Sequence, residues 1–145
     1  MDALGKGMKP IVMPHYPHML FEDTAIWTAY LSSPIVPIKA VWYDVHVGGV
    51  LLPVQQGDEL GLRIASGITR KRIDVVAQVG GGYWVVEIKP EAGFLALGQV
   101  CVYTRLFIEE YRPNGEVMPV IVCNKADPDI LPDFDSAGVG VIVTS

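Results

Sequence analysis

The stretch from residue 69 to residue 89, TRKRIDVVAQVGGGYWVVEIK, constrains the fold more than any other part of the chain. Two runs rich in β-branched and aromatic residues flank Gly80-Gly81-Gly82, a pattern typical of a β-hairpin. Pro90 is expected to end the second strand, because proline has no N–H to donate to a neighbouring strand. The pattern therefore predicts an antiparallel strand pair with its turn at these glycines.

The turn sets the register of the hairpin. With Gly80-Gly81 as the turn, Asp74 lies directly opposite Glu87, and Arg72 lies opposite Lys89. Because side chains two positions apart share a face of a strand, all four point the same way. The other face is expected to be apolar and to carry Ile73, Val75, Ala77, Trp84, Val86 and Ile88.

Two carboxylates directly opposite each other destabilise a sheet unless something compensates their charge. A divalent cation would do so, since hard oxygen ligands converging on one point suit magnesium or manganese. The alternative is a surface cluster in which Arg72 and Lys89 neutralise Asp74 and Glu87 without metal. The spacing alone leaves both interpretations open.

The rest of the chain alternates helical and strand patterns. Three prolines keep residues 1–19 irregular, and residues 50–69 fit no single element. The patterns predict a helix over 20–32, a strand over 38–49, the hairpin, a helix over 91–112 and strands over 116–124 and 139–145, with a polar connection over 125–138. This order favours an α/β fold (α+β, with a mixed sheet) in which helices pack on a central sheet.

Composition restricts the class of protein. The 145 residues are 50% hydrophobic and 19% charged, which is typical of a globular chain long enough for one domain with its own core. The formal net charge of −5 argues against broad nonspecific adhesion to nucleic acid or anionic membranes. No apolar run is long enough for a transmembrane helix, and the two cysteines are expected to be buried thiols, so an intracellular, cytoplasmic location is expected.

Asp74 followed by Glu87-Ile88-Lys89 resembles the D…(D/E)-x-K signature of the PD-(D/E)XK nuclease superfamily. Gln99 and Tyr103 resemble the Q-x-x-x-Y motif of its RecB-type branch, and being four apart they share one helix face. The resemblance implies a restriction-endonuclease-like α-β-β-β-α-β core. It covers residues 20–145 as a single nuclease domain, preceded by the irregular segment 1–19.

The resemblance also implies roles for individual residues. Asp74, Glu87 and the Ile88 carbonyl would bind one or two Mg²⁺ or Mn²⁺ ions, with Glu22 on the first helix as a further ligand. Lys89 would orient the attacking water and stabilise charge in the transition state. The remaining two catalytic candidates, which would position the DNA strand, are Gln99 and Tyr103.

DNA is the expected partner. Arg70, Lys71 and Arg72 form a local basic run beside Asp74 that is expected to contact phosphates, and Tyr83 could stack on a base or sugar. The expected function is metal-dependent hydrolysis of DNA phosphodiester bonds, as an exonuclease or in DNA-end or structure processing. Two alternatives stay open, a noncatalytic binding or assembly module with the same fold and a nuclease acting on RNA. A homodimer or larger homo-oligomer would suit cleavage of both strands, and no residue pattern establishes one.

Other polar residues give weaker patterns. His15 and His18 form an H-x-x-H pair, but Pro17 prevents helical spacing, so no metal site is expected there. His46 is interpreted as an ordinary strand residue, and the direction of Asp44 is left open. The aspartates of the 125–138 connection are expected to be solvated loop residues, since they lack the spacing of a calcium loop.

Overall fold

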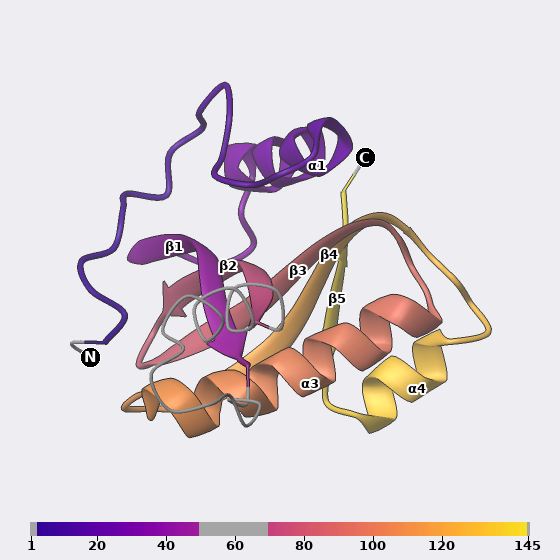
Figure 1. The fold of residues 1–145 in the computed structure, drawn as a ribbon. Helices are drawn as coiled ribbons and strands as arrows, with labels where there is room; N and C mark the ends of the chain where they lie inside the picture. Colours follow the sequence, from indigo (N-terminus) through magenta and orange to yellow (C-terminus); the bar gives the residue numbers. More distant parts are fainter. Residues whose placement is uncertain (1–2, 50–69, 145) are drawn as a thin grey trace, which may run out of the picture.

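The computed structural model describes residues 3–49 and 70–144, which form one five-stranded sheet with helices on both faces (Figure 1). The strands follow chain order across the sheet, antiparallel from β1 to β3 and parallel from β3 to β5. The elements are α1 (Phe21–Ser32), β1 (Ala40–Gly48), β2 (Arg70–Val79), β3 (Gly82–Ala92), α3 (Phe94–Tyr111), β4 (Val117–Ala126), α4 (Leu131–Ser136) and β5 (Gly140–Val143). The predicted mixed α/β class and the α-β-β-β-α-β order are confirmed. Residues 50–69, for which no single element was predicted, lie outside the described residues.

The sheet is covered on both sides (Figure 1). Helix α1 contributes Ile26, Trp27 and Tyr30 to a core that also contains Val75 and Val86 of the hairpin. On the other face, α3 packs through Ala96, Val100 and Phe107. The hairpin strands are thus buried on both faces, which is why they read as nearly continuous apolar runs.

The N-terminal segment is irregular, as predicted, and it is packed against the sheet. Met8 forms an isolated bridge with Val41 on the outer edge of β1. Gly7 lies so close to Ala40 and Trp42 that a Cβ on it would come within 2.8 Å of the Ala40 Cβ. Tyr16 is fully buried in the α1 core. This segment therefore belongs to the folded unit.

The hairpin turn and register are confirmed. The paired residues run from Val79 opposite Gly82 to Val75 opposite Val86, as a turn at Gly80-Gly81 requires. Gly80 has a φ of 56°, in the left-handed region that favours glycine. The register places Asp74 and Glu87 one step beyond the last regular pair.

Strand β3 does not end at Pro90, as the sequence had predicted. It continues to Ala92, pairing with β4 through Lys89 opposite Cys123 and Glu91 opposite Lys125. Because β2 pairs with β3 only as far as Val86, the missing N–H of Pro90 leaves no ladder partner unsatisfied on that side. Helix α3 consequently begins at Phe94, three residues later than residue 91.

Ile73 lies on the opposite side of the sheet from the one predicted. Val75 packs in the α1 core, whereas Ile73 packs with Phe107 in the α3 core. The neighbouring strand β1 changes face at the same level, where Asp44 has a left-handed φ of 53°. A strict period of two therefore fails here because the pairing of β1 with β2 is interrupted at Asp44 and Asp74, between the pairs Tyr43–Val75 and Val45–Ile73.

The 125–138 connection contains the short helix α4, which the sequence analysis had interpreted as a loop. Phe134 of this helix is buried against α3, and Asp133 and Asp135 stay exposed, as predicted. Among the residues the structure describes, no helix is long and apolar enough to cross a membrane.

Candidate active site

Asp74 and Glu87 meet where β2 and β3 separate. Instead of a regular ladder, the backbone N–H of Asp74 donates to Glu87 Oε2 at 3.0 Å, and the N–H of Ile88 donates to Asp74 Oδ2 at 2.8 Å. These reciprocal bonds fix both carboxyl groups against the backbone of the facing strand. They use one oxygen of each carboxyl group and hold the two acids close together.

The charge of this carboxyl pair is poorly compensated. Glu87 is only 3% exposed and Asp74 is half-buried. Burial raises the pKa of Asp74 to about 6, against the lowering effect of the Ile88 N–H. Burial and then the charge of Asp74 raise the pKa of Glu87 well above its ordinary value. Without a bound cation, the pair therefore holds protons more tightly than ordinary carboxyl groups do.

Lys89 is the cation whose charge acts on both carboxyl groups of this pair. Its charge lowers the pKa of Asp74, of Glu87 and of Asp23 on α1. Lys89 is half-buried on β3, two residues after Glu87. The three carboxyl groups and the ammonium group therefore act on one another as one electrostatic cluster.

The acid that α1 brings to this cluster is Asp23. The charge of Asp23 raises the pKa of both Asp74 and Glu87, whereas Glu22, the residue predicted from the sequence, is exposed and raises the pKa of Asp23. Burial is the largest cause of the raised pKa of Asp23 itself. Sequence reasoning had no signal to choose between two adjacent acids, because the rotation of α1 about its axis decides which one faces the sheet.

Gln99 and Tyr103 approach from α3. Burial raises the pKa of the Tyr103 hydroxyl, and the charges of Glu87 and then Asp74 raise it further. Gln99 Oε1 is buried and has no hydrogen-bond partner among the described residues. Both side chains line one surface groove. The Tyr103 hydroxyl is therefore within range of the charges of the carboxyl pair, and Gln99, which lines the same groove, has an unused acceptor.

Arg70, Lys71 and Arg72, the residues predicted to contact phosphates, have different surroundings in the structure. Arg70 donates to Glu110 Oε2 at 2.7 Å and to the His46 carbonyl at 2.9 Å, so it is held at the α3 side of the sheet. Lys71 lines the groove that contains Gln99 and Tyr103. Arg72 was predicted to lie opposite Lys89, but the pairing of β2 with β3 ends at Val75 opposite Val86, and Arg72 pairs with His46 of β1 on the other edge of β2.

Tyr83 is packed rather than fully presented to solvent. Its ring lies 6.1 Å from the Trp42 ring and 6.5 Å from the Phe107 ring, measured between centroids. It is half-buried beside the α3 core. This packing leaves part of the ring exposed.

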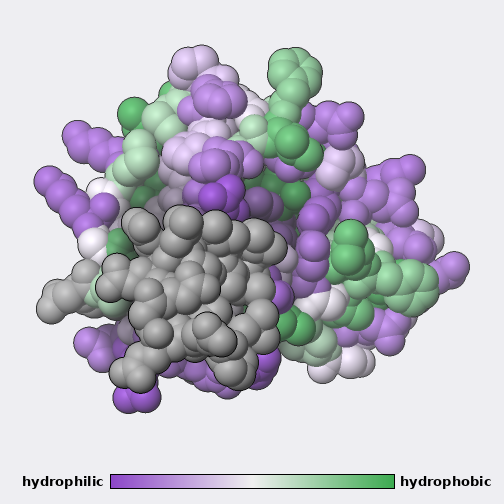
Figure 2. All heavy atoms as spheres, viewed as in Figure 1, coloured by the Kyte–Doolittle hydropathy of each residue, from purple (hydrophilic) through white to green (hydrophobic). Residues whose placement is uncertain are grey.

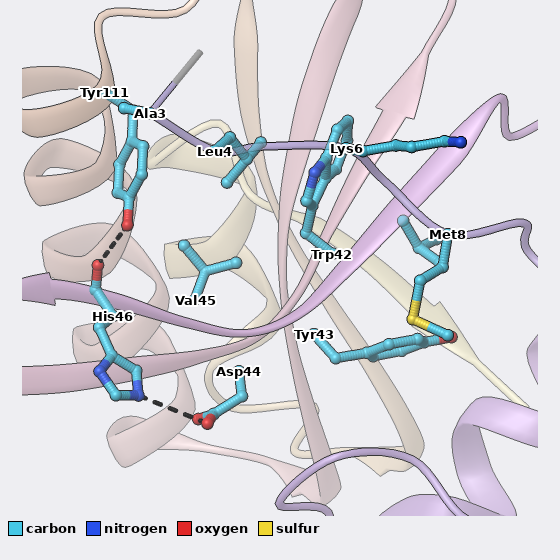
Figure 3. A pocket seen from close by; sticks show the side chains of 11 residues that line it. Ala3, Leu4, Lys6, Met8, Trp42, Tyr43, Asp44, Val45, His46 and Tyr111 are labelled. Carbon is cyan, nitrogen blue, oxygen red and sulfur yellow. Dashed lines mark hydrogen bonds and ion pairs between the residues drawn. The ribbon is translucent and has the colours of Figure 1, made fainter. Parts of the chain in front are cut away.

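A second polar cluster, which the sequence analysis did not assemble, surrounds Asp44. Asp44 Oδ2 lies 3.2 Å from His18 Nε2 and 3.4 Å from His46 Nε2, and Oδ1 lies 3.5 Å from Arg72 Nε. Arg72 also lies 3.0 Å from His18 Nδ1. Figure 3 shows Asp44 and His46 turned to the same side of β1, beside a cavity of about 420 Å³ under the N-terminal segment. The charge of Asp44 raises the pKa of Asp74, so the clusters are neighbours.

The Asp74–Glu87 pair suits an ion such as magnesium, which keeps water and phosphate ligands, better than it suits an ion bound entirely by protein side chains. In residues 3–49 and 70–144, no group of three or more His, Cys, Asp and Glu side chains is arranged to hold a metal ion. Magnesium commonly binds through one or two carboxylates and keeps water and substrate phosphates as its other ligands. Asp74 and Glu87 provide such a pair, with buried and repelling charges.

Comparisons with known proteins give two structural similarities. No protein-family model matches the sequence, and no curated protein matches it. A repair endonuclease from Pyrococcus abyssi superposes with a TM-score of 0.45 and 18% identity, over 72% of this chain and 39% of that one. A protein of unknown function superposes with a TM-score of 0.45 and 16% identity, over 83% of this chain and 55% of that one. The chain thus spans less than half of the first structure and little more than half of the second. Similarity at this level carries no argument about function, which depends here on the site itself.

Proposed function

We propose that this protein is a metal-dependent nuclease that hydrolyses DNA phosphodiester bonds, with Asp74 and Glu87 as the metal ligands. The observation that carries the proposal is the buried, mutually repelling carboxyl pair at the point where β2 and β3 separate, with Lys89 beside it. Such a pair is costly to the fold unless a cation compensates it. Perturbed acids of this kind are more frequent at functional sites than elsewhere.

Each residue of the site has a role in this proposal. Asp74, Glu87 and the Ile88 carbonyl hold the ion, Mg²⁺ or Mn²⁺, which would polarise the scissile phosphate and lower the pKa of bound water. The Lys89 ammonium stabilises the negative charge that develops on the phosphate. Asp23 takes the place first predicted for Glu22, since its charge acts on both carboxyl groups.

Gln99 and Tyr103 position the substrate or the attacking water. The buried Oε1 of Gln99 lacks a donor in the described structure, and a water molecule or a nucleotide amino group would supply one. The Tyr103 hydroxyl is held neutral by burial and by the nearby carboxyl groups, so it can donate a hydrogen bond. Both groups therefore suit contact with a phosphodiester strand.

A cleavage assay tests the proposal. Linear, circular and single-stranded DNA are incubated with magnesium, with manganese or with chelator, using the wild-type protein and the Glu87→Ala and Lys89→Ala variants. We expect products only with metal, and a rate loss of roughly a hundredfold or more in each variant, the size typical when one group that stabilises the transition state is removed. Linear and circular substrates together separate an exonuclease from an endonuclease.

Glu91→Ala is a matched control. Glu91 lies on the same strand and is exposed, and it pairs with Lys125 at 3.1 Å on the surface. This variant should retain the wild-type rate. A second comparison tests the acid on α1, since Asp23→Asn should lower the rate more than Glu22→Gln does. Equal rates for wild type and a folded Glu87→Ala variant would refute the proposal.

A second candidate function is a noncatalytic binding module. The reciprocal bonds between the carboxyl groups and the facing backbone favour it, because they satisfy two N–H groups that would otherwise lack ladder partners. In this alternative, the protonated pair is a structural clasp. Absence of cleavage on every DNA and RNA substrate, with no magnesium binding by calorimetry, would support it.

A further inference from the structure

An apolar groove on the surface adjoins the candidate active site. It has a volume of about 360 Å³ and lies along the first half of α3. Its principal lining residues are Lys71, Phe94, Leu95, Gln99, Val102 and Tyr103. Figure 2 shows hydrophobic side chains gathered on the surface over the start of α3. Tyr103 lines the groove and its hydroxyl is within range of the charges of Glu87 and Asp74, so this residue links the groove to the carboxyl pair.

Three apolar side chains that line the groove are exposed to solvent. Phe94 is 79% exposed, Leu95 is 68% exposed and Val102 is 40% exposed. A single exposed apolar residue is ordinary, but a contiguous group that includes an aromatic ring indicates a binding surface. None of these three side chains contributes to the cores below them. The fold therefore gains little from them at these positions.

Gly98 leaves the floor of the groove open. It lies inside α3, where glycine costs about 1 kcal/mol relative to alanine. A Cβ built on Gly98 would meet no atom within 4 Å, so close packing does not require a glycine there. Its φ is not in the left-handed region either, so backbone conformation does not require it. Neither packing nor backbone conformation therefore accounts for a glycine at this position of the groove.

We propose that this groove binds unpaired nucleotides of a DNA strand and directs that strand to the carboxyl pair. The inference rests on the proposed nuclease function and specifies its substrate class as single-stranded or frayed DNA. A nucleobase stacks on the Phe94 ring and lies against Leu95 and Val102, while Lys71 meets the backbone phosphate. Aromatic surface combined with a cation is the chemistry that binds single strands without regard to sequence.

A duplex does not fit this chemistry. Its bases are stacked on each other inside the helix, so it presents phosphates and leaves Phe94 and Leu95 in water. The net charge of −5 gives a duplex and a single strand alike little attraction over the whole surface. Discrimination between the two substrates should therefore come from the groove.

Binding measured without cleavage tests the inference. A fluorescently labelled oligothymidylate of about 12 nucleotides and a blunt duplex of the same length are titrated with the full chain in chelator, at one fixed low salt concentration. Phe94→Ala should weaken single-strand binding by roughly fivefold to a hundredfold, the range for loss of one base–aromatic stack, and should leave duplex binding within about twofold. Phe94→Trp should restore single-strand binding.

Two further variants complete the design. Gly98→Leu fills the groove with a residue that favours helix, and it should weaken single-strand binding by at least as much as Phe94→Ala. Ile108→Ala is the matched control, since Ile108 is an exposed apolar residue on the same helix but lines a different hollow. It should bind both probes like the wild type.

A 5-iododeoxyuridine placed within the oligothymidylate adds a direct readout. Ultraviolet irradiation should cross-link it to the peptide that contains Phe94. Equal losses for both probes in Phe94→Ala, or no loss in either Phe94→Ala or Gly98→Leu, would overturn the inference. So would a wild-type dimer in sedimentation that Phe94→Ala converts to a monomer, which would make the groove a surface for a second copy of the chain.

The outcomes separate this inference from the proposed function. Single-strand binding in chelator does not require catalysis, so it can succeed when the cleavage assay fails. Conversely, Glu87-dependent cleavage of duplex and single strands at equal rates, with Phe94→Ala unaffected, would retain the nuclease and remove the groove from its substrate path.

Discussion

Two acidic sites lie on neighbouring strands, and their charges are compensated in different ways. Asp44 on β1 is surrounded by two imidazoles and a guanidinium, all within 3.5 Å of its carboxylate oxygens. Asp74 and Glu87 face each other, and their closest hydrogen-bond partners are two backbone N–H groups. The Asp44 carboxylate therefore has a guanidinium in contact and two imidazoles that add positive charge when protonated, whereas at Asp74 and Glu87 the charge of Lys89 does not offset burial and mutual repulsion.

This difference indicates which site needs a ligand. Burial and then repulsion from Asp74 raise the pKa of Glu87, whereas a compensated carboxylate has no comparable demand for a cation. The proximity of the sites strengthens the contrast, because the charge of Asp44 also raises the pKa of Asp74. The Asp44 carboxylate thus adds to the repulsion at Asp74.

The gain in stability on adding magnesium should distinguish the two sites by the largest amount. Magnesium at about 100 times its dissociation constant is expected to stabilise the wild-type fold by about 2.7 kcal/mol, since it binds the folded state alone. Thermal unfolding with and without magnesium measures the effect. Asp44→Asn should retain this stabilisation, and Glu87→Gln should lose it. An undiminished shift in Glu87→Gln would place the ion elsewhere.

The pH dependence of stability should be the second-largest effect. The pKa of Asp74 rises from 3.8 to about 6 on folding, and that of Glu87 also rises, so between these values the folded chain binds more protons than the unfolded chain. In chelator, the contribution of Asp74 is therefore fully present at low pH and is lost as the pH rises from 3.8 through about 6, with a slope of at most about 1.4 kcal/mol per pH unit, and Glu87 contributes in the same direction from its ordinary value of 4.5 upward.

Urea unfolding at a series of pH values measures this slope. Saturating magnesium should flatten it, because the bound cation keeps both acids ionised. A stability that rises over the same window, equally in wild type and Glu87→Gln, would show that the pair is compensated in some other way.

Removing one charge from the uncompensated site should stabilise the fold. Glu87→Gln keeps an oxygen to accept the N–H of Asp74 and removes the repulsion, so the free energy of unfolding in chelator at neutral pH should increase by about 1 kcal/mol. Chemical denaturation of both proteins measures the difference. A loss of stability would mean that the charge of Glu87 is compensated in the native protein.

The same change at the compensated site should have the opposite sign and a smaller size. Asp44→Asn leaves two histidines and Arg72 without their carboxylate, and a loss of about 0.5 kcal/mol is expected because these partners are about half exposed. Asparagine tolerates the left-handed backbone at this position. A gain of stability in Asp44→Asn would remove the contrast between the sites. The pKa of Asp74 should also fall in this variant, which NMR titration can measure.

The local part of the site was predictable. The glycine turn fixes which residues of the hairpin face each other, so the opposition of Asp74 and Glu87 follows from counting along two strands. Helical spacing likewise places Gln99 and Tyr103 on one face of α3. Over such short distances the backbone geometry leaves few alternatives.

Long-range partners were not predictable in the same way. Choosing Asp23 over Glu22 requires the rotation of α1 on the sheet, and the His18–Asp44 contact joins the irregular N-terminal segment to β1, 26 residues further along the chain. Pro90 and Ile73 were misplaced for a related reason, since each depends on where neighbouring strands stop pairing or twist.

The sequence by itself determined the hairpin, its register and the mixed α/β class, because turn chemistry and periodicity are local properties of the chain. Only the tertiary structure decided which charges are compensated and which residues line the apolar groove along α3. Compensation depends on distances between groups from different elements, and those distances exist only after α1, β1 and α3 have packed on the sheet.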